Sequence, residues 1–418
     1  MSLDLLDKVK KKVGDEYKDI NRVVLAFSGG LDTTVIASLL LELGKEVITC
    51  TLDLGQEGEL KKITEKSKRI GIKKHYFIDA KKEFVREYIW PAIKANAMYE
   101  GSYPLFTALG RPLIAKKLAE IGKKENADAV CHGSTGKGND QVRIDAGVIA
   151  LSPMKVVAPV RDWGLTRDVE IEYALNRKLD VKITKDKPYS IDENLWGRSI
   201  EAGPIENPEQ VVPEDAYEWT KPVEQAPSQS EIAEIFFESG VPKEIEIDGT
   251  TYKDEIEMIK RLSAVAGAHG IGRIEHMEDR TMGFKSREVY ETPAAFIVLP
   301  AHKDLEKYIL TKDEIFHKAY LDNLYSTLVY EGKWYSPLRV ALDKFNQEVE
   351  TNVTGSVKIK LYKGGASTIS RKSKNALYDF NIATYNKGSS FNQKEGGIFT
   401  KIWLMQYSTA YKMKYDLK

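Results

Sequence analysis

The sequence contains few cysteines and no excess of charge of either sign. Only two of its 418 residues are cysteine, and Cys50 and Cys131 lie at the ends of apolar, strand-like runs. We expect both to be small buried hydrophobic side chains rather than a disulfide or a metal pair. Lys plus Arg number 62, as do Asp plus Glu, so no overall field attracts the chain to nucleic acid or an anionic membrane. We expect neither as a partner.

Long hydrophobic runs and metal-ligand spacings are also missing. No segment approaches the roughly 20 apolar residues that span a membrane. The opening MSLDLLDKVKKKVGDEYKDI has no apolar core of signal-peptide length. We therefore expect a soluble, cytoplasmic protein. The six histidines show no H-E-x-x-H or related spacing, so we predict no protein metal site.

The chain is long enough for about two to three domains. Short β-branched runs alternate with helical patterns from residue 23 to about 178, in the runs RVVLAF, EVITCTLD, KHYFID, DAVCHG and KVVAPV. This alternation predicts an α/β domain with a doubly wound parallel sheet, which we assign to residues 1–178. The stretches after the first, second and fourth runs are polar and Gly-rich. We expect them to meet at the carboxyl ends of the strands, where such folds bind ligands.

The pattern changes from residue 179. Hairpin patterns in EIEIDGTTYKDEIE and SVKIKLYKGGASTIS alternate with helical patterns such as EIEMIKRLSAVAG and KAYLDNLYSTLVYEG. They predict a second, α+β domain over residues 179–372. YSIDENLWGRS, near the joint, is interpreted as a lid or an interdomain loop. Residues 373–418 form a tail whose apolar side chains are predicted to dock on another subunit or on the chain's own core.

A Gly-rich turn joins the first expected strand to the first expected helix. AFSGGLDTT, residues 26–34, follows Val23-Val24-Leu25 and precedes a helical pattern that stops at Gly44. Such a turn directs backbone N–H groups and a helix N-terminus at one anion. It lacks both the spacing and lysine of a Walker loop and the G-x-G-x-x-G of a dinucleotide fold. Two interpretations of the turn remain. It binds the pyrophosphate part of ATP, or it is only a tight turn between a strand and a helix.

Two stretches together resemble the argininosuccinate synthases, a family within the N-type ATP pyrophosphatases. They are AFSGGLDTT and GSTGKGNDQVR, the latter at residues 133–143. Further matches in register are EYIWPAI at 87–93, residues 103–112, SIDENL at 190–195 and GRIEHMEDRTMGFKSREVYETPA at 272–294. The resemblance covers nearly the whole chain and weakens after about residue 350.

This resemblance implies an adenine nucleotide alpha hydrolase-like first domain, a synthetase domain and a C-terminal oligomerisation tail in a homotetramer. It implies a ligase of arginine biosynthesis that joins L-citrulline and L-aspartate to give argininosuccinate. ATP, accompanied by Mg²⁺, is cleaved to AMP and pyrophosphate through a citrullyl-AMP intermediate. No tightly bound cofactor is implied.

The resemblance also implies which residues bind each substrate. ATP is expected at Ala26, Phe27, Ser28, Gly29, Gly30, Leu31, Asp32, Thr33, Thr34, Leu52 and Gly133. Citrulline is expected at Tyr103, Thr107, Asn139, Arg143, Ser190, Ser199, Glu278 and Tyr290, and aspartate at Thr135, Asn139 and Asp140. Asp140 is the candidate general base, while Asp32 is expected to hold the cation or orient the loop.

One departure from the family pattern and two rival functions stay open. Ala108 stands where the family usually has a hydroxyl residue that contacts citrulline, and Thr107 could replace that contact. The first rival is a tRNA-modifying, thiolating or amidotransferring enzyme of the same fold, which the cysteine count and zero net charge disfavour. The second is a nucleotide-binding protein without catalysis, which the intact Asn139, Asp140 and Arg143 disfavour.

Overall fold

The structure, a computed structural model, describes residues 17–56, 60–181, 189–386 and 388–417. The expectation that the chain carries no signal peptide rests mainly on residues 1–16, which lie outside the described residues. No helix in the described part of the chain combines the length and apolarity that crossing a membrane requires.

The first domain is built around a parallel five-stranded sheet with the strand order β3-β2-β1-β4-β5. Its strands are β1 (Arg22–Ala26), β2 (Glu46–Asp53), β3 (Lys74–Asp79), β4 (Ala129–Cys131) and β5 (Lys155–Val157). Its helices are α2 (Leu31–Glu42), α3 (Leu60–Ile70), α4 (Lys81–Phe84), the π-helical turn η2 (Val85–Ile89), α5 (Trp90–Lys94), α6 (Phe106–Glu125), α7 (Asn139–Leu151), α8 (Pro159–Asp162) and α9 (Arg167–Asn176). Each strand falls within one of the five predicted runs.

Helices cover both faces of this sheet because side chains alternate along each strand. Val24 of β1 packs in one hydrophobic cluster with residues of α6 and α7, whereas Val23 and Leu25 pack in a second cluster with residues of α2 and α9. The doubly wound sheet is therefore confirmed. Cys50 and Cys131 are both buried in these clusters, and burial raises the pKa of Cys50 to about 12. This confirms the prediction that both are packing residues.

The second domain contains two antiparallel sheets, in the orders β10-β9-β8-β13-β14 and β11-β12-β7-β6. The strands are β6 (Ser190–Asn194), β7 (Gly197–Glu201), β8 (Glu231–Glu238), β9 (Val241–Ile247), β10 (Thr250–Tyr252), β11 (Arg273–Asp279), β12 (Lys285–Glu291), β13 (Gly355–Tyr362) and β14 (Gly365–Lys372). The helices are α10 (Glu255–Ala268), α11 (Ala295–Ile309), α12 (Lys312–Tyr330) and α13 (Pro337–Val349), with the 3-10 turns η3 (Gly203–Glu206), η4 (Glu214–Ala216), η5 (Val223–Gln225) and η6 (Glu350–Asn352). Both predicted hairpins and both predicted helices are present, which confirms an α+β domain.

The interpretation of YSIDENLWGRS as a lid or a loop is wrong. This segment forms β6, a tight turn and β7, and β7 also pairs with β12. Leu195 and Trp196 are buried, and the indole N–H of Trp196 donates to the carbonyl of Pro104 at 3.1 Å. Ile191 is 41% exposed, and it lines a cleft together with the polar residues that suggested a loop.

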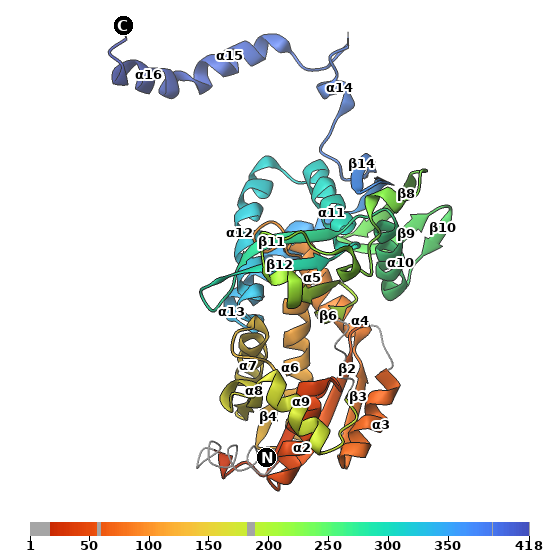
Figure 1. Cartoon of the computed structure of the whole chain (residues 1–418). Coiled ribbons are helices and arrows are strands. Elements are labelled where there is room, and N and C mark those ends of the chain that lie inside the picture. The colour runs from red at the N-terminus through yellow and green to blue at the C-terminus, as the bar shows by residue number, and fades with distance from the viewer. Residues whose placement is uncertain (1–16, 57–59, 182–188, 387, 418) are drawn as a thin grey trace.

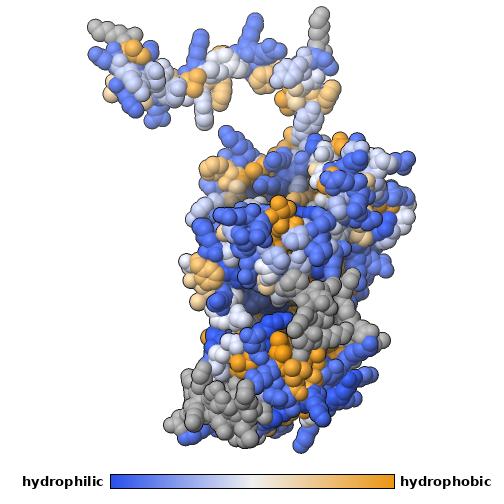
Figure 2. Space-filling view, viewed as in Figure 1, coloured by the Kyte–Doolittle hydropathy of each residue, from blue (hydrophilic) through white to orange (hydrophobic). Residues whose placement is uncertain are grey.

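The tail leaves the body of the protein after β14 (Figure 1). It consists of α14 (Phe380–Ala383), α15 (Gln393–Trp403) and α16 (Met405–Lys414), and Figure 2 shows apolar side chains along it. Trp403 is 69% exposed. The alternative that the tail docks on the chain's own core is therefore wrong, whereas docking on another subunit stays a prediction. The domain limits at residues 178 and 372 stay predictions as well.

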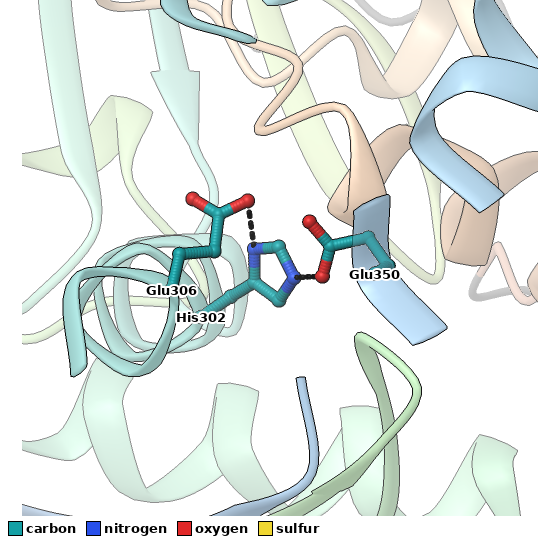
Figure 3. Close-up of side chains that lie close together, drawn as sticks. All are labelled: His302, Glu306 and Glu350. Atoms are coloured by element: carbon teal, nitrogen blue, oxygen red, sulfur yellow. Dashed lines mark hydrogen bonds and ion pairs between the residues drawn. The ribbon is translucent and has the colours of Figure 1, made fainter. Parts of the chain in front are cut away.

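A polar cluster is buried inside the second domain (Figure 3). Nε2 of His302 lies 3.0 Å from Oε2 of Glu350, and Nδ1 lies 3.8 Å from Oε1 of Glu306. Nζ of Lys318 lies 3.0 Å from Oε1 of Glu306 and 3.7 Å from Oε1 of Glu350. The spacing of ligand types along the sequence gave no sign of this cluster, because it joins α11, α12 and η6. Lys318 supplies the cation that the two carboxylates share.

Candidate active site

The three polar stretches meet at one end of the parallel sheet. The strand order reverses between β1 and β4, where such sheets open into a crevice. The loops after β1, β2 and β4 line a cleft of about 1330 Å³, and residues of β6, β7, β11 and β12, among others, contribute to its lining. The predicted position of the ligand-binding loops is confirmed, and the second domain contributes to the same cleft.

The loop after β1 folds back onto the first turn of α2. Oγ of Ser28 lies 3.2 Å from Oγ1 of Thr33 and accepts a hydrogen bond from the backbone N–H of Gly30 at 3.3 Å. Gly29 has a φ of +74°, in the left-handed region that glycine adopts without strain. Gly30, Leu31 and Thr33 line the cleft. The start of α2 is therefore available to an anion.

A pair of carboxyl groups lies beside this loop. Glu170 of α9 is only 2% exposed and lies close to Asp32 at the start of α2. Burial and the negative charge of Asp32 together raise the pKa of Glu170 to about 8. At neutral pH Glu170 is therefore mostly protonated and can donate its proton to Asp32, whose carboxylate lines the cleft.

The first turn of α7 places three functional side chains in the cleft. Asn139, Asp140 and Arg143 follow one another at helical spacing, so they project from neighbouring positions on one side of the helix. Nη1 of Arg143 lies 3.3 Å from Oδ1 of Asp140. Arg143 is 4% exposed, so its charge is held close to its partners rather than in solvent.

Arg111 joins Asp140 to a second carboxylate across the cleft. Its Nη2 lies 2.7 Å from Oδ2 of Asp140 and also donates to Asp192 of β6. Burial alone would raise the pKa of Asp140, but Arg111 and Arg143 outweigh burial and lower it to about 2. Burial, with the charge of Asp140, raises the pKa of Asp192 despite Arg111. Asp140 is therefore a stable anion and a weak proton acceptor.

The wall from the second domain carries a buried carboxylate surrounded by hydroxyl groups. Tyr290 donates to Oε2 of Glu278 at 2.8 Å, and its ring centroid lies 4.7 Å from that of Tyr103. Burial would raise the pKa of Glu278, but His276, whose Nε2 lies 3.4 Å from Oε2, hydrogen bonds from two tyrosines and the charge of Arg143 together lower it. Glu278 is therefore ionised at neutral pH and suited to pair with an ammonium group.

Most of the predicted binding residues lie in this one cleft. Those that line it are Ala26, Phe27, Ser28, Gly30, Leu31, Asp32, Thr33, Leu52, Tyr103, Thr107, Gly133, Thr135, Asn139, Asp140, Arg143, Ser190, Ser199, Glu278 and Tyr290. Gly29 and Thr34 do not, and Thr34 is fully buried under the start of α2. Ala108 is buried in the hydrophobic core, whereas the neighbouring Thr107 faces the cleft.

Comparison with known proteins assigns most of the chain to one family. Residues 22–180 match the family model described as Arginosuccinate synthase N-terminal HUP domain, and residues 189–410 match Arginosuccinate synthase C-terminal domain. The chain belongs to the argininosuccinate synthase family. Argininosuccinate synthase of Pyrococcus furiosus is 52% identical over 394 residues, which are 94% of this chain and 95% of the relative. That of Bacillus subtilis is 48% identical over 91% of this chain and 94% of the relative.

Membership of the argininosuccinate synthase family makes the chain a ligase of arginine biosynthesis. The parallel-sheet domain is a HUP domain, the class to which ATP-using enzymes of this kind belong. The rival assignment to tRNA-modifying, thiolating or amidotransferring enzymes is therefore wrong.

Several cleft residues were not assigned a role from the sequence. They are Arg111, Asp192, Glu201, Arg280 and Glu288. Arg111 and Asp192 lie inside two of the stretches that carry the resemblance to argininosuccinate synthases, so a signal for them was present. The ion pair between them could not be predicted from the sequence, because 81 positions separate the two residues.

Proposed function

We propose that the enzyme joins L-citrulline and L-aspartate, with cleavage of ATP to AMP and pyrophosphate, to give argininosuccinate. The arrangement of the first turn of α7 supports this most directly. Asn139, Asp140 and Arg143 lie between the loop at Ser28 and the carboxylate of Glu278, within one cleft. This gives an anion-binding loop, cations and carboxylates around one volume, as a triphosphate and two amino acids require.

The reaction consists of two displacements. The ureido oxygen of citrulline attacks the α-phosphorus of ATP, the bond to the bridging oxygen breaks, and pyrophosphate leaves. The product, citrullyl-AMP, has a good leaving group on the ureido carbon. The amine of aspartate, once its ammonium group has lost a proton, attacks that carbon. The bond from the carbon to the former ureido oxygen breaks, AMP leaves with that oxygen, and the remaining proton passes to solvent.

The ATP site is proposed at the loop after β1. Backbone N–H groups at the start of α2 and the hydroxyls of Ser28 and Thr33 are suited to the β- and γ-phosphates. Mg²⁺ prefers oxygen ligands, and the carboxylate of Asp32 offers one in this part of the cleft. The neutral Glu170 leaves the charge of Asp32 available to that ion.

Citrulline is proposed to bind between α7 and the wall from the second domain. Arg143 provides a fork for the α-carboxylate, and Glu278 provides a counter-charge for the α-ammonium. The hydroxyls of Tyr103, Thr107, Ser190, Ser199 and Tyr290, with the amide of Asn139, are available to the rest of the molecule. These groups combine charges for the zwitterion with neutral donors and acceptors for the ureido group.

Aspartate is proposed to bind at Thr135, Asn139 and Asp140. We assign Asp140 to pair with the α-ammonium of aspartate rather than to act as the general base. Its low pKa, held by Arg111 and Arg143, favours a permanent negative charge and disfavours proton uptake. A cytoplasmic location and a homotetramer also belong to this proposal, and the exposed apolar side chains of the tail support association between copies.

The proposal is tested by product analysis with ATP, Mg²⁺, citrulline and aspartate. Release of AMP and pyrophosphate that depends on both amino acids, with argininosuccinate detected by mass, would support the proposal. Citrulline labelled with ¹⁸O in the ureido group should transfer the label to AMP. ATP binding without any citrulline-dependent product would instead support a nucleotide-binding protein without catalysis. AMP without label would overturn the citrullyl-AMP step.

A further inference from the structure

Tyr330 lies behind the cleft and contacts two residues of the proposed citrulline site. It is the last residue of α12 and is 1% exposed. Its hydroxyl donates to Oε1 of Glu278 and accepts a hydrogen bond from Nδ2 of Asn139 at 2.8 Å. Oδ1 of Asn139 accepts from the backbone N–H of Thr281 at 3.1 Å. The Tyr330 hydroxyl therefore fixes the amide of Asn139 and the carboxylate of Glu278 relative to each other.

Tyr330 also holds a third residue of the same site. Nε of Arg143 donates to the backbone carbonyl of Tyr330 at 3.0 Å, and the guanidinium carbon lies 4.9 Å from the Tyr330 ring centroid. The ring itself is stacked on Tyr99, with centroids 3.6 Å apart and planes inclined by 6°. The stacking on Tyr99 thus helps to hold the Tyr330 ring, and with it the hydroxyl, in place.

We propose that Tyr330 is a positioning residue that fixes Asn139, Arg143 and Glu278 as one recognition unit for the amino-acid substrate, in which Arg143 and Glu278 serve its zwitterionic end. This inference rests on the proposed function, because it assigns that end to citrulline. A single hydroxyl can satisfy an amide donor and a carboxylate acceptor together, which a phenylalanine cannot do. Tyr330 is not among the residues that line the cleft, so it acts through its three neighbours.

The test is the variant Tyr330→Phe, which keeps the stacked ring and removes the hydroxyl. Loss of a hydrogen bond to a charged group should raise KM for citrulline about tenfold or more, with KM for ATP changed by less than about twofold. Glu278 also loses one of the donors that lower its pKa. The acid limb of kcat/KM for citrulline should therefore move to higher pH.

Tyr335→Phe is the matched control. It removes a hydroxyl five residues further along the same segment, which donates to the backbone carbonyl of Pro112 at 2.8 Å. This variant should leave KM for citrulline and the acid limb unchanged. Tyr330→Phe should raise KM for citrulline by a smaller factor when it is added to Glu278→Gln than when it is added to the parent. The reason is that Tyr330 acts partly through Glu278.

Two results would overturn the inference. In the first, Tyr330→Phe has the same KM for citrulline and the same pH profile as the parent. The other is a uniform loss of kcat with all three substrates and a lowered Tm, which would indicate a merely structural residue. Failure of the proposed function is recognised separately, since the parent protein would then form no argininosuccinate and would show no citrulline binding by calorimetry.

Discussion

Nη2 of Arg111 lies 2.7 Å from Oδ2 of Asp140, and the same nitrogen donates to Asp192 on the hairpin of the second domain. Arg111 is on α6 and Asp140 is on α7, so one cation ties two helices of the first domain to β6. This contact helps to keep Asp140 ionised although it is partly buried, and it connects the helices of the first domain to the sheet that carries Glu278.

Arg111→Met should raise the pKa of Asp140, because burial would then be opposed mainly by Arg143. We expect the acid limb of kcat/KM for aspartate to move to higher pH and KM for aspartate to rise. The measurement is the pH dependence of initial rates at limiting aspartate. Arg86→Met, at an exposed arginine paired with Glu255, is the control. An acid limb identical in the parent and Arg111→Met would contradict the role of Arg111.

Thr107→Val should weaken citrulline binding, because Thr107 lines the cleft and Ala108 does not. Removal of one neutral hydrogen bond costs about 0.5–1.5 kcal/mol, which corresponds to a rise in KM of about 2- to 12-fold. Steady-state kinetics at saturating ATP and aspartate measure this. Ala108→Ser should change KM for citrulline by less than about twofold. A larger effect at Ala108 than at Thr107 would show that the wrong residue has been assigned to citrulline.

Glu170→Gln should make stability less dependent on pH. The pKa of Glu170 is raised to about 8 in the folded protein by burial and by Asp32. The free energy of unfolding therefore includes a contribution from keeping Glu170 protonated in the folded state. This contribution is fully present below about pH 4.3, the pKa of the unfolded chain, and it is lost as pH rises through the higher pKa of the folded protein. Glutamine cannot ionise, so the Tm of the variant should fall less between about pH 5 and pH 9 than the Tm of the parent does. Glu172→Gln, at an exposed position of the same helix, is the control, and its Tm should fall with pH as much as that of the parent.

Lys318→Met should destabilise the second domain strongly. Lys318 is 2% exposed and pairs with Glu306 at 3.0 Å and with Asp322 at 2.9 Å. Removal of one partner from a buried ion network leaves uncompensated charge and costs about 3–5 kcal/mol. Denaturant-induced unfolding followed by circular dichroism measures this change, with Lys303→Met at an exposed position of α11 as the control. Equal stability of the two variants would show that the cluster is not maintained by Lys318.

Deletion of residues 390–418 should reduce the number of subunits in the assembly. The deleted segment carries Phe399, Ile402 and Trp403, which are 61%, 66% and 69% exposed in the single chain. Their burial against a second copy would provide the hydrophobic contribution to association. Light scattering coupled to size-exclusion chromatography measures the mass. An unchanged subunit number after deletion would refute the role of the tail in assembly.

The segment that follows the joint between the two domains was misread from its sequence. The polar residues of YSIDENLWGRS suggested a loop, because local polarity is the usual sign of exposure. The hairpin forms because β7 pairs with β12, about ninety positions later, and because polar side chains face a cleft. Tyr330 gave no signal at all, since an aromatic residue at the end of a helix is most often core.

The sequence by itself determined the parallel sheet, the position of the loops at its carboxyl end and the family, because these depend on local periodicity and on contiguous motifs. Only the tertiary structure decided which charges meet. Arg111 with Asp192 and Tyr330 with Glu278 are pairs that lie 81 and 52 positions apart in the chain. Such contacts set the pKa of Asp140 and the orientation of the recognition groups, because electrostatic and hydrogen-bond energies depend on distances in space.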